Sequence, residues 1–152
     1  MQFIADSMLG RLARWMRTIG CDVAYYRDIK DRDLTDIAQR ENRMILTRDT
    51  LLIKRKRVRG NAFFVEGDSY KDQLRQVALT FSIDPYQNLL TRCIECNVRL
   101  EDIDREKVVG SLPEYVSKSQ DLFRTCLRCS RIYWPATHKD SIMRTLHEIF
   151  GE

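Results

Sequence analysis

Four short apolar runs, each followed by an acidic residue, constrain the fold of this chain more than any other feature. The clearest run, residues 44–46, leads directly into Thr47-Arg48-Asp49. The other runs are residues 3–5, 23–26 and 62–65, and the acids that follow them are Asp6, Asp28 and Asp68. Helix-like stretches separate the runs, and this alternation predicts an α/β fold with a mostly parallel sheet flanked by helices. The acids should then meet at the carboxyl edge of the sheet, where ligands bind in such folds.

Apolar residues at helical spacing predict that the segments between and after these runs are helices. The first helix follows Ser7 and ends at Gly20, since glycine favours helix termination. A second begins near Asp31 and Asp33, because acidic residues suit a helix cap or first turn. Further helices are expected over residues 50–56, 69–81, 85–90 and 137–150.

The character of the chain changes near residue 91. Before this point, strand-like and helix-like stretches alternate; after it, paired cysteines appear and helical periodicity weakens. We predict an α/β domain over residues 1–91 and a zinc-ribbon domain with a terminal helix over residues 92–152. The second segment is too short to build a large core, so a structural metal ion would suit it.

The composition is that of a globular chain, with 43% hydrophobic and 32% charged residues. No apolar run approaches the roughly 20 residues that a membrane span requires. The first residues lack the basic start and the apolar core of a secretory signal. We therefore expect a cytoplasmic protein with no membrane partner.

Four of the five cysteines form two pairs, Cys93-x-x-Cys96 and Cys126-x-x-Cys129. In an intracellular chain this spacing is typical of zinc binding. The 29 residues between the pairs exceed the commonest spacing, but closure entropy grows slowly with loop length. Four thiolates leave Zn²⁺ no open coordination position, so the predicted zinc site is structural.

The acids at the predicted sheet edge indicate a second metal site. Neighbouring carboxylates repel one another unless a cation neutralises them, and hard oxygen ligands favour Mg²⁺ or Mn²⁺. Such ions polarise phosphodiesters and activate water. Asp6, Asp49 and Asp68 are candidate ligands, while Asp31 and Asp33 compete for a further position because helix capping also explains either residue. The chain has no glycine-rich phosphate loop and no Gly-x-Ser-x-Gly motif.

The formal net charge of +4 is concentrated beside these acids. Residues 1–90 contain 16 basic and 12 acidic residues, whereas residues 91–152 contain ten of each. Basic side chains around a carboxylate metal site suit a polyanionic substrate, although ordinary surface charge explains the same count. The candidates for phosphate contact are Arg11, Arg14, Arg48, Lys54, Arg55, Lys56 and Arg57.

Three stretches together resemble the Mut-seven C-terminal ribonuclease domain family, a branch of the PIN-like nucleases. They are residues 3–17, residues 45–49, and the paired cysteines with the segment Tyr133-Trp134-Pro135-Ala136-Thr137-His138. One departure is Ala136, where we expect the family to favour glycine. The resemblance covers nearly the whole chain, and it implies a PIN-like fold, a zinc ribbon and metal-dependent cleavage of RNA.

The resemblance also implies roles for particular residues. It places Asp6 and Asp49 in the catalytic site, either Asp31 or Asp33 at a third position and Asp68 at a fourth. The ribbon would position RNA, with Tyr133, Trp134 and His138 at its contact edge unless the two aromatic residues form the ribbon core. The alternative function is a non-catalytic RNA- or ribosome-binding module that keeps a nuclease-like shape.

Overall fold

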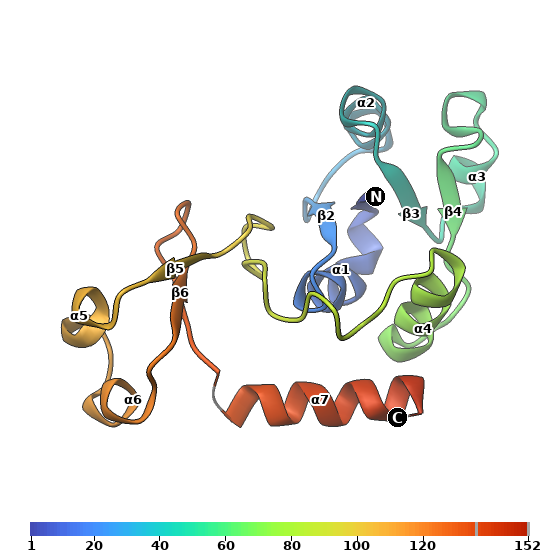
Figure 1. The fold of residues 1–152 in the computed structure, drawn as a ribbon. Helices are drawn as coiled ribbons and strands as arrows, with labels where there is room; N and C mark the ends of the chain where they lie inside the picture. Colours follow the sequence, from blue (N-terminus) through green and yellow to red (C-terminus); the bar gives the residue numbers. More distant parts are fainter. Residues whose placement is uncertain (136, 152) are drawn as a thin grey trace. The chain divides into compact units, whose positions relative to one another are not determined.

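The computed structural model describes residues 1–135 and 137–151, which form two compact units (Figure 1). The first unit is Met1–Leu90, and the second begins at Thr91. Ala136, where the family is expected to favour glycine, and the side chain of Thr137 lie outside the described part of the chain.

A four-stranded parallel sheet forms the centre of the first unit. Its strands are β1 (Gln2–Ala5), β2 (Asp22–Tyr25), β3 (Met44–Thr47) and β4 (Ala62–Phe64), in the spatial order β2-β1-β3-β4. In the register, Ile4 pairs with Ala24 on one side and with Ile45 on the other. Each predicted apolar run is a strand and every pairing is parallel, which confirms the α/β prediction. The carboxyl ends of all four strands therefore lie at one edge.

Helices cover both faces of this sheet (Figure 1). The helices on one face are α2 (Asp31–Glu41) and α3 (Thr50–Ile53), with the 3-10 turn η2 (Lys56–Val58); those on the other face are α1 (Gly10–Thr18), preceded by η1 (Ser7–Leu9), and α4 (Tyr70–Thr80). Ile4 and Ile45 pack with Leu34 of α2 on the first face. Side chains alternate along a strand, so Phe3 points to the opposite face, where its ring lies 5.2 Å from that of Phe81.

Two of the expected helices differ from the prediction. Helix α3 ends at Ile53, three residues earlier than expected. The helix predicted over residues 85–90 is wrong, because these residues form turns. Their path is fixed by the end of α1: the amide of Leu90 donates to the carbonyl of Thr18 at 2.8 Å, and a Cβ on Gly20 would lie 2.3 Å from the carbonyl oxygen of Asn88.

The second unit is built on a small antiparallel sheet. Its strands, in spatial order, are β5 (Glu101–Ile103), β6 (Phe123–Thr125) and β7 (Ile132–Tyr133). The connection from β5 to β6 contains α5 (Arg105–Val108), η3 (Val109–Ser111) and α6 (Glu114–Ser119), and the unit ends with α7 (Thr137–Phe150). Val108, Val116 and Phe123 form the core, and Trp134 packs against it. Trp134 is therefore a ribbon core residue.

None of the helices in the described part of the chain is both long and apolar enough to cross a membrane.

Candidate functional site

The two Cys-x-x-Cys segments fold into knuckles with the same backbone geometry. In each, the amide of the first cysteine donates to the carbonyl five residues later, at 2.8 and 3.1 Å. Its carbonyl accepts from the amide four residues later, at 2.9 and 2.8 Å. The residues that follow the second cysteines, Asn97 and Ser130, have φ angles of 65° and 63°. A left-handed residue closes both turns, so the two pairs are presented in the same way.

The four thiols converge on a common point. Their Sγ atoms all lie within 4.8 Å of one another, and those of Cys93 and Cys129 are 3.8 Å apart. In a tetrahedral site with Zn–S bonds of about 2.3 Å, neighbouring sulfurs are about 3.8 Å apart. The donor set therefore fits Zn²⁺, and the four cysteines could bind a structural zinc ion as the spacing predicts.

Burial and neighbouring hydrogen bonds shift the pKa values of groups in this cysteine site. The hydroxyl of Tyr133 lies 3.1 Å from Cys93 Sγ, and burial raises the pKa of Tyr133 well above its usual value. The hydroxyl therefore keeps its proton and lies within hydrogen-bond distance of the sulfur. A backbone hydrogen bond from Arg131 lowers the pKa of Cys129 to about 7, whereas burial raises that of Cys96 to about 12. Binding a metal ion must displace protons from such thiols, so zinc affinity should fall as the pH is lowered.

Asp6 is a buried carboxylate at the carboxyl end of β1. The residue is 4% exposed, and its Oδ1 and Oδ2 accept hydrogen bonds from the Ser7 amide (2.7 Å) and the Thr47 hydroxyl (2.8 Å). Tyr25 holds the turn after Asp6, since its hydroxyl donates to the carbonyl of Ser7 at 2.7 Å. Within the described residues, Asp6 forms no ion pair with a lysine, arginine or histidine. Buried charges are normally paired or bound to metal, so Asp6 fits a cation ligand.

Thr47 connects Asp6 to Asp49. The Thr47 hydroxyl, which is fully buried, donates to Asp6 and accepts from the amide of Asp49 at 3.0 Å. Asp49 in turn caps α3, because its Oδ1 accepts from the amides of Leu51 and Leu52 at 2.9 and 3.3 Å. Its second oxygen, Oδ2, accepts no hydrogen bond from the residues that the structure describes. The two carboxylates are thus held through one side chain, and Asp49 keeps an oxygen available.

Arg48 organises the loop that follows β4. Its Nη1 donates to the carbonyls of Val65 (2.8 Å), Glu66 and Gly67 (2.6 Å). Its Nη2 lies 3.0 Å from Oδ1 of Asp68, whose side chain is 99% exposed. The guanidinium of this predicted phosphate ligand is therefore engaged within the first unit, where it holds the loop that presents Asp68.

The predicted carboxylates are less closely gathered than the cysteines. Among the described residues, the cysteines are the one group of three or more possible metal ligands whose donor atoms lie within 4.8 Å of one another. Asp31 and Asp33 lie in the first turn of α2. Asp31 pairs with Arg55 at 3.4 Å, and Asp33 is exposed. The structure thus links Asp6 with Asp49 and leaves both candidates for the third position open.

The four predicted phosphate ligands of the basic run, residues 54–57, fall into two groups. Arg57 pairs with Asp36 of α2 at 2.6 Å, and the arginine holds the pKa of that carboxyl below its usual value. Arg55 is paired with Asp31 in the same manner. Lys54 and Lys56, in contrast, are exposed and have no polar partner in the described part of the chain. The two lysines are thus better placed to meet a phosphate than the arginines beside them.

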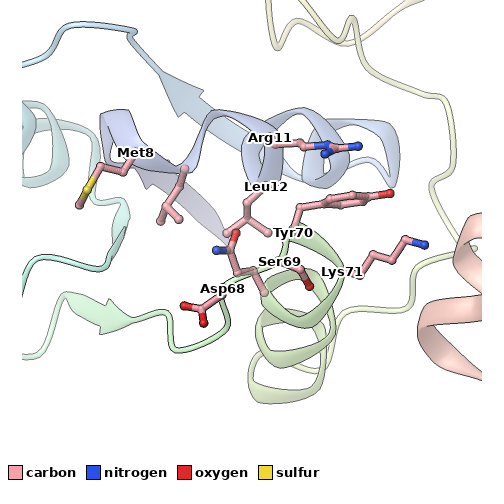
Figure 2. Close-up of a pocket in the computed structure, with 9 residues that line it drawn as sticks. Met8, Arg11, Leu12, Asp68, Ser69, Tyr70 and Lys71 are labelled. Atoms are coloured by element: carbon pink, nitrogen blue, oxygen red, sulfur yellow. The ribbon is translucent and has the colours of Figure 1, made fainter.

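A pocket of about 380 Å³ lies between the start of α1 and the start of α4 (Figure 2). Side chains between Met8 and Leu12 and between Asp68 and Gln73 line it. Arg11 lies over the ring of Tyr70, with its guanidinium carbon 4.0 Å from the ring centroid (Figure 2). The pocket shares Asp68 with the acidic edge, and its other wall begins two residues after Asp6.

The sequence analysis missed two residues of this region, Thr47 and Tyr70. A threonine at the end of a buried strand is a common β-sheet residue, and only the pairing of β1 with β3 places its hydroxyl against Asp6. Tyr70 was expected only as the start of a helix, and its contact with Arg11 depends on the packing of α4 against α1. Neither role leaves a signal in local sequence.

The fold and these sites define an α/β protein with an acidic edge on its parallel sheet and a cysteine tetrad suited to zinc. A family model described as the Mut7-C RNAse domain matches residues 1–146. The chain belongs to this family, as the resemblance predicts, which relates its function to that of ribonucleases and indicates RNA as the substrate. No match was found among curated proteins or among solved structures.

Proposed function

We propose that the chain is a metal-dependent ribonuclease that cleaves RNA phosphodiesters at the carboxyl edge of the parallel sheet. Asp6 and Asp49 would hold Mg²⁺ or Mn²⁺ with Asp68 and either Asp31 or Asp33. The observation that carries this proposal is Asp6, a carboxylate 4% exposed that has no ion-pair partner in the described part of the chain. Such a group is costly in a protein interior unless a cation compensates it.

The protein's own contribution is to fix the direction of the carboxylates. A divalent ion at this edge would supply an activated water and would stabilise the leaving oxygen. Thr47 and the amide of Ser7 orient Asp6, while the first turn of α3 orients Asp49. Arg48 holds the loop on which Asp68 lies. Asp6 and Asp49 are therefore directed before substrate binds, and the backbone that carries Asp68 is held in place.

Substrate binding would depend on basic residues around this edge. Lys54 and Lys56 have no polar partner among the described residues and are exposed, so they are free to meet phosphates. Arg55 and Arg57 form ion pairs on the surface, where such pairs contribute little stability and exchange readily for phosphate. Arg11 and Arg14 of α1 would contact the same strand. The ribbon would position the RNA, with a structural Zn²⁺ that takes no part in the chemistry.

The test is cleavage of single-stranded and structured RNA in Mn²⁺ by the wild type, Asp6→Asn and Asp49→Asn. Each substitution should lower the rate by at least about a hundredfold, as loss of a positioned electrostatic group does. Asp102→Asn is the matched control, because that side chain is 94% exposed on β5 and lies outside the proposed site; it should leave the rate unchanged.

Equal rates for the wild type and Asp6→Asn would refute the site. Absence of cleavage by the wild type with any metal ion, together with RNA binding that survives both substitutions, would instead support the non-catalytic RNA- or ribosome-binding module.

A further inference from the structure

We propose that the pocket between α1 and α4 binds one unpaired nucleotide of an RNA strand, with Arg11 holding its phosphate. The inference rests on the proposed ribonuclease function and adds to it a substrate class, single-stranded RNA. Three features of the pocket support it. The guanidinium of Arg11 is held in place, the walls offer both apolar and polar groups, and Asp68 belongs to the pocket and to the acidic edge.

The first feature is the way in which Arg11 is held. Its guanidinium lies over the Tyr70 ring at 4.0 Å, and that ring is stacked on Trp15, with centroids 5.7 Å apart and planes inclined by 15°. A cation–π contact uses the face of the guanidinium and leaves its in-plane N–H groups free. In the part of the chain that the structure describes, Arg11 forms no ion pair. It therefore presents a fixed fork of donors, which matches the oxygens of a phosphate.

The second feature is the composition of the walls. Met8 and Leu12 supply an apolar wall from the η1–α1 side, while Ser69 and Gln73 supply polar groups from the α4 side. Gln73 donates its amide to the carbonyl of Gly67 at 2.8 Å, so its side-chain oxygen is directed by that bond. A nucleobase has apolar faces and polar edges, and the pocket volume of about 380 Å³ lies in the range of small-ligand sites.

The third feature is the position of the pocket beside the acids. Asp68 belongs to both the pocket and the proposed metal site. A strand anchored in the pocket would therefore continue along the edge where cleavage is proposed. A base that is paired and stacked in a duplex cannot enter a pocket, whereas an unpaired base can. The site should consequently select single-stranded RNA.

The experiment measures RNA binding without cleavage. Fluorescence anisotropy of the full chain is followed with a labelled oligouridylate and with a labelled RNA duplex of the same length, in buffer without added divalent cations. The variants are Arg11→Gln, Arg11→Lys and Tyr70→Phe. Arg40→Gln serves as the matched control, since Arg40 is an exposed helical arginine on α2, outside the pocket.

Arg11→Gln should weaken oligouridylate binding roughly five- to tenfold and make its salt dependence shallower by about 0.7 in the log–log slope. Duplex binding should change less than about twofold. Arg11→Lys keeps the charge but loses the planar fork, so it should recover only part of the affinity. Tyr70→Phe keeps the ring and should bind as the wild type does. Arg40→Gln should leave both affinities unchanged.

Equal losses for oligouridylate and duplex would show a general phosphate contact and would overturn the nucleotide pocket, as would unchanged binding by Arg11→Gln. Arg11 is exposed, so its substitution tests the proposal without a risk to folding. The two proposals fail separately: if the wild type cleaves RNA but Arg11→Gln binds normally, only the pocket is wrong. If no cleavage occurs with any metal ion and Arg11→Gln binds weakly, only the ribonuclease assignment is wrong.

Discussion

The cysteine tetrad and the acidic edge are both candidate metal sites, but their donor groups are held in different ways. The thiols lie within 4.8 Å of one another, in knuckles closed by their own backbone hydrogen bonds. The carboxylates instead accept hydrogen bonds from Thr47, from backbone amides and from Arg48. The cysteine tetrad supplies four ligands at one point, whereas the carboxylates of the acidic edge are held separately by different parts of the first unit.

This difference matches what two kinds of metal site require. A structural ion needs all of its coordination positions filled by protein, and a tetrahedron of thiolates achieves this. An ion that acts on phosphates is commonly bound by only one or two carboxylates and keeps positions for water and substrate. The looser gathering of Asp6, Asp49 and Asp68 therefore agrees with a site completed by its substrate.

The largest effect is expected from removing one ligand of the cysteine tetrad. Cys96→Ser removes one of four thiolates, and structural zinc contributes on the order of 10 kcal/mol to the folding of small domains. The variant should lose stoichiometric zinc and leave the second unit unfolded, as measured by metal analysis and by the dispersion of amide resonances. Cys21→Ser is the control, because Cys21 lies outside the tetrad, and it should retain zinc. A folded, zinc-loaded Cys96→Ser protein would contradict the tetrad.

A smaller effect is expected from removing the Thr47 hydroxyl, which connects Asp6 with Asp49. Thr47→Val keeps the shape of the side chain but leaves Oδ2 of buried Asp6 without the Thr47 hydroxyl that donates to it. This should lower the free energy of unfolding by about 1–3 kcal/mol, as measured by urea denaturation. Thr35→Val is the matched control, since among the described residues the buried Thr35 hydroxyl donates only to the carbonyl of Asp31 in its own helix. If both variants lose the same stability, Thr47 has no special relation to Asp6.

The smallest effect is expected at the edge of the cysteine site. Tyr133→Phe removes the hydroxyl that lies 3.1 Å from Cys93 Sγ, and loss of such an outer partner typically weakens metal binding by roughly tenfold. Competition with a chelator would measure this change. Tyr115→Phe, at a tyrosine that is 74% exposed, should leave the affinity unaltered. Identical zinc affinities for the two variants would show that the hydroxyl does not support the thiolate.

The sequence predicts most reliably those structural features that a local pattern of residues determines. Four apolar runs predict the four strands, because helices on both faces of the sheet bury the centres of β1, β2 and β3 and partly bury β4. The Cys-x-x-Cys spacing predicts the tetrad, because two short turns bring the thiols together whatever lies between them. The family resemblance, carried by motifs along the whole chain, is confirmed by the match over residues 1–146.

The sequence predicts less well where distant segments decide the outcome. Asp84-Pro85 favours a helix start locally, but contact with Gly20 and Thr18 holds residues 85–90 in turns. Arg48 has the chemistry of a phosphate ligand, and only the folded loop reveals that carbonyl oxygens already surround its guanidinium. The choice between Asp31 and Asp33 stays a prediction, since both lie in the same first turn of α2.

The contacts of Arg48 also have a consequence for motion. One guanidinium donates to three successive carbonyls, those of Val65, Glu66 and Gly67. A loop held in this way loses its conformational freedom when the chain folds, and little entropy remains to be lost when a ligand arrives. The backbone at Asp68 thus enters binding already ordered, although its carboxylate stays in solvent. Contacts within the first unit therefore set the order of this loop, and the proposed metal site would not have to create it.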